Sequence, residues 1–514
     1  MASKATTQSF IHEFQLVTTP KENRILEVRL NAGRNLYNAC LSETLTRLHA
    51  MRGSDAWRTA RNMPHGKART AAFQAVNDRF AYGEYSLHKY AASVCHACWI
   101  GDHLDSLTAQ KLASRAFIAV KEYQFGKRGK PRFKRYGWMS SLEGKNNASG
   151  IKWRDGRVQW NGLDLRCVFD RKDKHGIQAH ALSQTVKYCR LVRKVIRGNT
   201  CWFVQLILSG APKIKAKNAI GCEAVGLDIG PSTIAVVGDT DACLLLFCPE
   251  VDVRHKQIRS LQRKMDRSRR ATNPDNYDRN GTVRPGKKTW HRSRKYLALR
   301  SKLANRWQAM SETRKRSHGN LANKVLSLGA TISTEDLSYR DLQKQYGKSI
   351  GRRAPGTFIE ILGRKAANAG GRILEFSTRT TALSQTCHCG HKARKHLRDR
   401  WHVCQKCGAV AQRDLYSAFL AKYVHDDVLD IRQAEQAWPG AHLLLERAIS
   451  ALQHQAANGL STSASFGLNQ RQSRSLVKDG SMAAEVCDSA SIAKEAVKAA
   501  HAAGVSIAVR TPWP

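Results

Sequence analysis

The pattern of apolar and polar positions changes twice along the chain. An early segment, FQLVTT, predicts a short strand, and apolar residues then recur at helical spacing over residues 21–122. Residues 150–210 switch to period two, and Asp155-Gly156 at the centre of one alternating stretch predicts a tight hairpin. We therefore expect a small N-terminal sheet that is interrupted by a helical insertion.

The second half of the chain alternates short apolar strands with longer helices. EAVGLDIG, TIAVVG and CLLLFC predict three consecutive strands, two basic helices follow, and ATISTEDLSY predicts a fourth strand. A helix after Pro355 leads to a fifth strand, RILEF, and the last helix begins at Asp414. This order of elements is that of an α/β fold of the ribonuclease H-like type, in which the first and fourth strands are neighbours at the centre of the sheet.

Three acidic residues lie at positions in this order of elements from which their side chains can converge. Asp228 lies within the first strand, which is apolar on both faces, so that an unpaired charge there would cost several kcal/mol. Glu335 ends the fourth strand and Asp414 begins the last helix, which packs over the same end of the sheet. Such a cluster can hold two Mg²⁺ or Mn²⁺ ions for phosphodiester hydrolysis. Taken alone, Glu335 also fits a solvent-exposed strand end, with Asp336 as a rival, and Asp414 fits an ordinary helix N-cap.

Two cysteine pairs lie between the fifth strand and the last helix. The second pair has the C-x-x-C spacing of a structural zinc site, whereas the first pair is one residue shorter. A zinc ribbon is predicted, in which a turn tightens or His388 or His391 replaces a cysteine; a metal-free ribbon is the alternative. Its position before the helix allows it to place Asp414. The leading ligand set is Cys387, Cys389, Cys404 and Cys407.

The charge of the chain indicates a polyanionic partner. Its 514 residues include 85 Lys+Arg and 41 Asp+Glu, a net charge of +44. Residues 430–514 contain eight basic and seven acidic residues, so nearly all of the excess lies before them. No apolar run reaches the roughly 20 residues of a membrane-spanning helix, and the N-terminus lacks an apolar signal core. We expect a cytoplasmic nucleic-acid-binding protein with reduced cysteines and no membrane partner.

Residues 123–138, YQFGKRGKPRFKRYGW, interleave cations with aromatic rings. Cations neutralise phosphates, and flat rings stack on unpaired bases. The alternative is a solvated basic loop whose rings are packed beneath it. The overall charge favours contact with nucleic acid. The expected contact residues are Lys127, Arg128, Lys130, Arg132, Lys134 and Arg135.

In combination, GLDIGPST, STEDLSY and SQTC…CQKCG…RDLYSAFLA resemble the three RuvC motifs and the zinc ribbon of the TnpB family of transposon-encoded RNA-guided nucleases, which is related to type V CRISPR effectors. The resemblance extends from about residue 10 to 424. It implies that Asp228, Glu335 and Asp414 are the catalytic acids of an RNA-guided DNA endonuclease, associated with a transposon, in a prokaryotic cytoplasm. The implied partners are a guide RNA and double-stranded target DNA with a short flanking motif.

The resemblance also implies a division into domains around a RuvC nuclease with an inserted zinc ribbon. In chain order it assigns 1–20 to the first strand of a wedge-like β domain, 21–122 to a helical recognition insertion, 123–215 to a basic linker and the rest of the wedge-like domain, 222–380 to the first part of the RuvC domain, 381–411 to a ribbon that binds target nucleic acid, and 412–428 to the final RuvC helix. The resemblance does not cover residues 429–514, and we expect a largely disordered tail there, because the stretch STSASFGLNQRQSRS contains few large apolar residues.

Two residues beside the last acid depart from the family pattern. Tyr416 stands where the family usually has Asn, and Gln412 stands where an acidic residue is common. Either change can weaken the metal site, so an RNA-guided DNA-binding protein that acts by occupancy, with weak or no cleavage, is the second hypothesis. A strand-transferring transposase would share the fold and the metals, but the RNA-binding insertions and the ribbon disfavour it.

Overall fold

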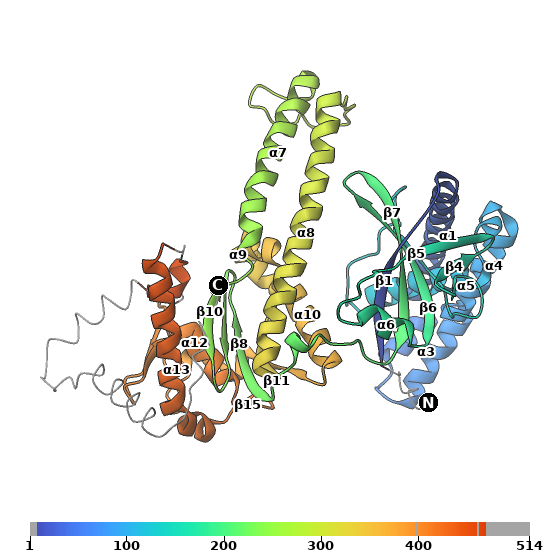
Figure 1. Cartoon of the computed structure of the whole chain (residues 1–514). Helices are drawn as coiled ribbons and strands as arrows, with labels where there is room; N and C mark the ends of the chain where they lie inside the picture. Colours follow the sequence, from blue (N-terminus) through green and yellow to red (C-terminus); the bar gives the residue numbers. More distant parts are fainter. Residues whose placement is uncertain (1–7, 397, 460–461, 469–514) are drawn as a thin grey trace, which may run out of the picture.

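The computed structural model describes residues 8–396, 398–459 and 462–468. These residues form two bodies, one before and one after the connection near residue 215, and a long pair of helices projects from the second body (Figure 1). Among the described residues, none of the helices combines the length and the apolar character that crossing a membrane would require.

The N-terminal body contains an antiparallel sheet with the strand order β2-β6-β7-β1-β5-β4-β3. The expected hairpin is present, because β3 and β4 are joined by Asp155 and Gly156, which both have the positive φ of a tight two-residue turn. The strands are β1 (Ser9–Leu16), β2 (Ser141–Glu143), β3 (Lys152–Arg154), β4 (Arg157–Trp160), β5 (Leu163–Val168), β6 (Val186–Ile196) and β7 (Asn199–Ser209).

Helices inserted between β1 and β2 cover this sheet, as the helical spacing of residues 21–122 predicts. The first begins with a capping box, in which Thr19 and Glu22 each accept a hydrogen bond from the other's backbone N–H. Trp160 and Trp202 of the sheet are buried in the shared core. The helices are α1 (Pro20–Gly53), α2 (Asp55–Asn62), α3 (Lys67–Arg79), α4 (Glu84–Ala97) and α5 (Ser106–Gln124); α6 (Ile177–Leu182) follows β5.

The second body is built on a five-stranded sheet with the order β10-β9-β8-β11-β12. Strands β8, β11 and β12 are parallel, and β9 and β10 are antiparallel to their neighbours. The expected pairing of the first and fourth strands is confirmed, because Leu227 pairs with Thr334. The strands are β8 (Glu223–Ile229), β9 (Thr233–Val237), β10 (Ala242–Leu246), β11 (Gly329–Asp336) and β12 (Arg372–Ser377).

Helices cover both faces of this sheet. Val225 and Leu227 point to the face that packs on α8 and α10, whereas Ala235 and Val237 point to the face that packs on α12 and α13. The connection from β10 to β11 is the projecting pair α7 and α8 (Figure 1). The helices are α7 (Glu250–Thr272), α8 (Arg294–Leu328), α9 (Tyr339–Arg353), α10 (Pro355–Asn368), α11 (Thr378–Thr381), α12 (Arg413–Ala421) and α13 (Ile431–Ala457).

The chain after α12 differs from the expectation. The final helix was expected over residues 412–428, but α12 ends at Ala421 and is followed by a short hairpin of β15 (Val424–His425) and β16 (Val428–Leu429). Residues 431–457, which the expected disordered tail includes, form α13 and bury Leu445 and Ile449 against α12. The end of the expected tail, residues 469–514, lies outside the described residues.

Candidate functional site

Asp228 and Glu335 lie side by side at the carboxyl ends of the two central parallel strands. Because Leu227 pairs with Thr334, the next residue of each strand, Asp228 and Glu335, points to the opposite face from that pair. This is the face that α12 covers, since Gly226, two residues before Asp228, lies directly against that helix. The register of two strands therefore brings two of the predicted acids together.

Asp414 reaches the same place from the first turn of α12. Burial, together with the negative charges of Asp414 and Glu335, raises the pKa of Asp228 well above its usual range. Burial also raises the pKa of Glu335 and that of Asp414. Desolvated carboxylates that oppose one another's ionisation suit a divalent cation, which restores their charged form. An all-oxygen donor set is also what Mg²⁺ prefers.

Two arginines on the ribbon side of the acids were missed by the sequence analysis. Arg413 Nε lies 3.5 Å from Asp414 Oδ1, and Arg413 Nη1 donates to the Asp399 carbonyl at 2.8 Å. The backbone of Arg400 accepts a hydrogen bond from the Arg413 N–H. The positive charges of both arginines act against burial on the pKa of Asp228 and that of Asp414. A loop of the ribbon thus contributes to the electrostatics of the acidic site.

Tyr339, at the start of α9, is a further group beside the acids that was missed. Burial, followed by the charges of Glu375, Asp336 and then Asp228, raises its pKa. The phenol therefore keeps its proton and can donate a hydrogen bond to an anionic ligand. Its place at a strand-to-helix junction, four residues after Glu335, was the available signal.

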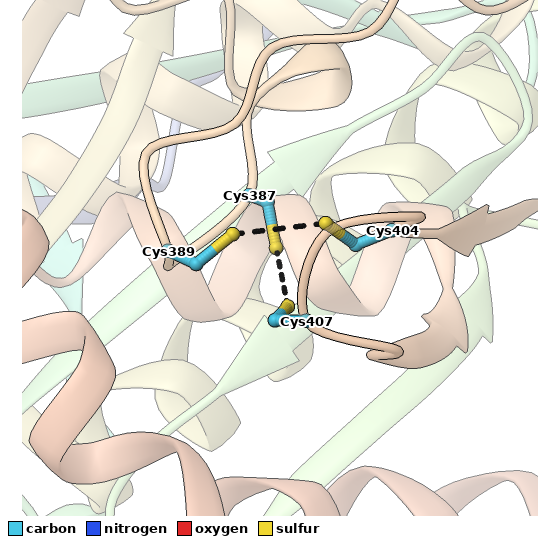
Figure 2. A group of neighbouring side chains, drawn as sticks. All are labelled: Cys387, Cys389, Cys404 and Cys407. Atoms are coloured by element: carbon cyan, nitrogen blue, oxygen red, sulfur yellow. Dashed lines mark hydrogen bonds between the residues drawn. The ribbon is translucent and has the colours of Figure 1, made fainter.

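The four ribbon cysteines converge on one point (Figure 2). The sulfurs of Cys387 and Cys407 are 3.5 Å apart, and those of Cys389 and Cys404 are 3.6 Å apart. Among the described residues, this is the only group of three or more candidate ligand atoms that all lie within 4.8 Å of one another. Zinc with Zn–S bonds of about 2.3 Å places tetrahedral sulfurs about 3.8 Å apart. The thiols are free, so the cluster can hold zinc.

Neither histidine considered as an alternative ligand belongs to this group. The ring nitrogens of His388 come no closer than 3.9 Å to the sulfurs of Cys387 and Cys407. Its Nδ1 instead lies 2.8 Å from the hydroxyl of Tyr416. The geometry favours the four cysteines over a set in which His388 or His391 takes part.

The two residues that depart from the family pattern have other contacts. The side-chain oxygen of Gln412 accepts the N–H of Leu415 at 2.8 Å and so caps α12, while its amide faces Asp414 and favours the charged form. Tyr416 directs its hydroxyl to the ribbon, 3.2 Å from Cys387 Sγ. Neither side chain replaces one of the three acids.

Four aromatic residues of the basic segment 123–138 are exposed, whereas the first, Tyr123, is partly buried against the core. The exposed fractions are 64% for Phe125, 56% for Phe133, 77% for Tyr136 and 69% for Trp138. Rings at the surface among cations favour stacking on bases over the alternative of a solvated loop on buried rings. All six expected contact residues are exposed except Lys134, which is half-buried over the ring of Tyr37.

The projecting helices α7 and α8, with the loop between them, carry a large net positive charge. Residues 250–328 contain 22 Lys or Arg and six Asp or Glu. At the far end, Arg269 lies over the rings of Tyr277 and Trp290 and fixes the connecting loop. The pair of helices is therefore a preformed basic arm that suits a phosphate backbone.

In the comparison with known protein families, a family model matches one segment of the chain. Residues 356–420 match the family model of the Cas12f1-like TNB domain. The segment runs from α10 through β12 and the ribbon to α12, so it contains the four cysteines and Asp414. This part of the chain is similar to the TNB domain of Cas12f1-like proteins. No curated protein matches the chain.

Several solved structures also match. One is the cryo-EM structure of a Cas12f1–sgRNA–target DNA complex, at 13% identity and a TM-score of 0.42, covering 80% of this chain and 98% of that one. A CRISPR-Cas12f ternary complex matches at 14% identity and a TM-score of 0.27, covering 79% and 82% of the two chains. The structure of the mini-RNA-guided endonuclease CRISPR-Cas_phi3 matches at 14% identity and a TM-score of 0.28, covering 55% of this chain and 57% of that one.

Proposed function

We propose that the protein is an RNA-guided DNA endonuclease that hydrolyses phosphodiester bonds in a RuvC-type, ribonuclease H-like site. One observation carries the proposal. Asp228, Glu335 and Asp414 lie near one another, close enough for their charges to interact, at one end of a sheet with the strand order of that fold, and Asp414 lies in a segment similar to the Cas12f1-like TNB domain. Transposon-encoded TnpB proteins and compact type V effectors are the two settings that fit this combination.

The three acids would hold Mg²⁺ or Mn²⁺, which supplies an activated water and stabilises the leaving oxygen. The chain itself fixes where the ligand oxygens lie, because Asp228 and Glu335 come from paired strands and Asp414 from a helix packed on them. Tyr339 lies near enough for the charges of Asp228 and Glu335 to act on its pKa, and its protonated hydroxyl would donate a hydrogen bond to a phosphate oxygen.

The proposed partners are a guide RNA and double-stranded target DNA with a short flanking motif. Base pairing between guide and target would supply sequence specificity, so that the protein needs charge and shape more than base-reading side chains. The basic segment 123–138 and the arm of α7 and α8 offer such surfaces. In this account the N-terminal body comprises the wedge-like and recognition domains, and the ribbon contacts target nucleic acid.

A DNA-binding protein that acts by occupancy is the second candidate. It is favoured by Tyr416 and Gln412, which stand beside Asp414 in place of residues that the family usually has. However, Tyr416 faces the ribbon and Gln412 caps α12, so all three acids keep their places. The endonuclease therefore accounts for more of the site.

The two candidates differ in what a guided complex does to its target. The protein is purified after coexpression with its neighbouring genomic locus, and the RNA that copurifies is sequenced. A plasmid that matches the guide is then incubated with the complex and Mg²⁺, beside a plasmid with a scrambled target. Cutting of the matched plasmid alone supports the endonuclease. Tight binding without cutting in Mg²⁺ or Mn²⁺ supports occupancy, and purely heterogeneous RNA contradicts both.

A further inference from the structure

Cys387 begins the shorter of the two zinc knuckles, with the spacing C-x-C, and Cys404 begins the longer one, with the spacing C-x-x-C. In the longer knuckle, backbone N–H groups surround the sulfur of Cys404. The backbone N–H groups of Lys406 and Cys407, two and three residues after Cys404, both interact with the Cys404 sulfur. The next N–H, that of Gly408, donates to the Cys404 carbonyl oxygen at 3.0 Å. The Cys404 sulfur thus lies close to two backbone amide groups.

The shorter knuckle has lost one of those donors. The N–H of Cys389, two residues after Cys387, interacts with the Cys387 sulfur. The N–H three residues on, that of Gly390, donates instead to the Cys387 carbonyl oxygen at 2.9 Å. Because the turn closes one residue early, the amide that would reach the sulfur is used by the carbonyl.

The hydroxyl of Tyr416 occupies the place of the missing donor. It lies 3.2 Å from Cys387 Sγ, 2.8 Å from the backbone nitrogen of His388 and 2.8 Å from His388 Nδ1. A phenol has one proton to donate and two positions at which to accept. The His388 backbone N–H fills one accepting position. A zinc-bound thiolate can only accept, so the phenol proton goes to the sulfur and a protonated Nδ1 fills the last position.

The ring of Tyr416 is held firmly enough for this task. It is 1% exposed. The ring of His402, from the ribbon strand β13 (Trp401–Val403), stacks on it at 4.0 Å, and Trp438 of α13 meets it edge-on at 5.2 Å. Two elements on either side thus fix the direction of the hydroxyl.

We propose that Tyr416 is a positioning residue that donates a hydrogen bond to zinc-bound Cys387 and so compensates for the residue missing from the C-x-C turn. The shortened knuckle and the Tyr in place of Asn are then one paired change. Tyr416 lies two residues after Asp414 on α12, so the same contact ties the start of that helix to the ribbon. The inference concerns zinc binding and does not require that the protein cuts DNA.

The test removes the hydroxyl alone. Tyr416→Phe keeps the ring and its packing, and the zinc dissociation constant is measured on the full chain by competition with a chromophoric chelator. We expect affinity to fall by about 10- to 100-fold, the usual effect of losing a partner of a metal ligand. The matched control is Tyr423→Phe, close to the end of the same helix, whose ring packs against Phe419 and should leave zinc affinity unchanged.

A rescue variant tests whether the Tyr416 hydroxyl replaces the missing amide donor or whether Tyr416→Phe only loosens the packing around the ribbon. Inserting one Gly between His388 and Cys389 restores the C-x-x-C spacing, and with it an amide donor to the sulfur. In the Tyr416→Phe background this insertion should recover most of the lost affinity, and the thiolate-to-metal absorption of the Co²⁺-loaded protein should move back toward that of the unchanged chain. The proposal is wrong if Tyr416→Phe binds zinc as tightly as the unchanged chain, if the insertion recovers nothing, or if the unchanged chain binds no zinc.

Discussion

Gly226 of β8 and Ala418 of α12 are in direct backbone contact: a Cβ on Gly226 would lie 1.8 Å from the Ala418 carbonyl oxygen. No side chain fits between them, so the helix rests on the strand itself. Asp228 follows Gly226 by two residues on the same face, and Asp414 precedes Ala418 by one helical turn. This contact therefore sets how closely two of the proposed catalytic acids approach.

Replacing Gly226 with Ala should lift α12 from the sheet. The added methyl group meets backbone, which cannot rotate away, so we expect a loss of at least about 1–3 kcal/mol in unfolding free energy. Chemical denaturation measures it. The control is Gly319→Ala in α8, where no atom lies within 4 Å of the new Cβ. That change should be neutral or stabilise by up to about 1 kcal/mol. Equal effects of the two variants would contradict the close contact.

The ribbon should bind about one zinc ion per chain. Changing Cys404 and Cys407 to Ser together removes two ligands, so metal analysis of the purified variant should find no zinc. The same double change at Cys95 and Cys98, which lie near the end of α4 and outside the cluster, should keep the full zinc content. Retention of zinc by the first variant would show that other residues bind the metal.

The exposed rings of segment 123–138 should contribute to RNA binding through stacking. Changing Tyr136 and Trp138 to Ala should weaken binding by about 1–3 kcal/mol for each base that loses a ring. The dependence on salt should stay the same, because no phosphate contact is removed. Filter binding at several salt concentrations measures both quantities. Tyr85→Ala, another exposed aromatic residue on α4, is the control. Unchanged affinity would show that these two rings do not contact the RNA.

The core of the second body contains a histidine that should make stability depend on pH. His318 of α8 is 0% exposed and stacks on Phe247 at 5.3 Å. Its ring nitrogens lack a well-formed hydrogen bond, although the backbone of Arg353 lies close enough to favour the proton slightly. Burial lowers the pKa of His318 to about 4, from an ordinary value near 6.5.

Because the pKa is lower in the folded state, the unfolded chain binds this proton first as the pH falls. The contribution of neutral His318 is complete above about pH 6.5 and declines between about 6.5 and 4, with a total loss of about 3 kcal/mol. His318→Phe keeps the ring stacking and should flatten this part of the curve of unfolding free energy against pH. An unchanged slope in the variant would assign the pH dependence to other groups.

The arrangement of the acids could be predicted because it depends on short-range rules. Alternation along a strand places Asp228 on a known face, and the parallel neighbour of its strand follows from the order of elements. The convergence of the four cysteines likewise follows from their spacing. The roles of Arg400, in the ribbon, and Arg413, at the start of α12, could not be predicted, since they depend on how the ribbon folds back on that helix.

The misses have physical reasons as well. Helix α9 is largely polar and buries only Ile350 and Arg353, so it leaves no clear periodic signal. Helix α13 does show the spacing of a buried face, from Leu445 to Ile449 and Leu452, but the polar, low-complexity sequence after it suggested disorder. The contact between Tyr416 and Cys387 joins residues that no local rule relates.

The two acidic residues at the end of β11, Glu335 and Asp336, point to opposite faces of the sheet. Glu335 faces α12 and the other acids, whereas Asp336 beside it points away and is exposed. Glu335→Gln should therefore abolish guided cleavage, and Asp336→Asn should leave most of it. If Asp336→Asn instead abolishes cutting in a plasmid assay and Glu335→Gln keeps most of it, Asp336 is the catalytic acid.

The most direct test of the nuclease is guided plasmid cutting by Asp228→Asn. The variant keeps the size of the half-buried side chain on the face of β8 that α12 covers, so folding and RNA content should match those of the unchanged protein. We predict that the unchanged complex cuts a matching plasmid in Mg²⁺, and that the variant binds it equally well but cuts several orders of magnitude more slowly, since a principal metal ligand is lost. Cutting by Asp228→Asn at the rate of the unchanged protein would place the active site elsewhere.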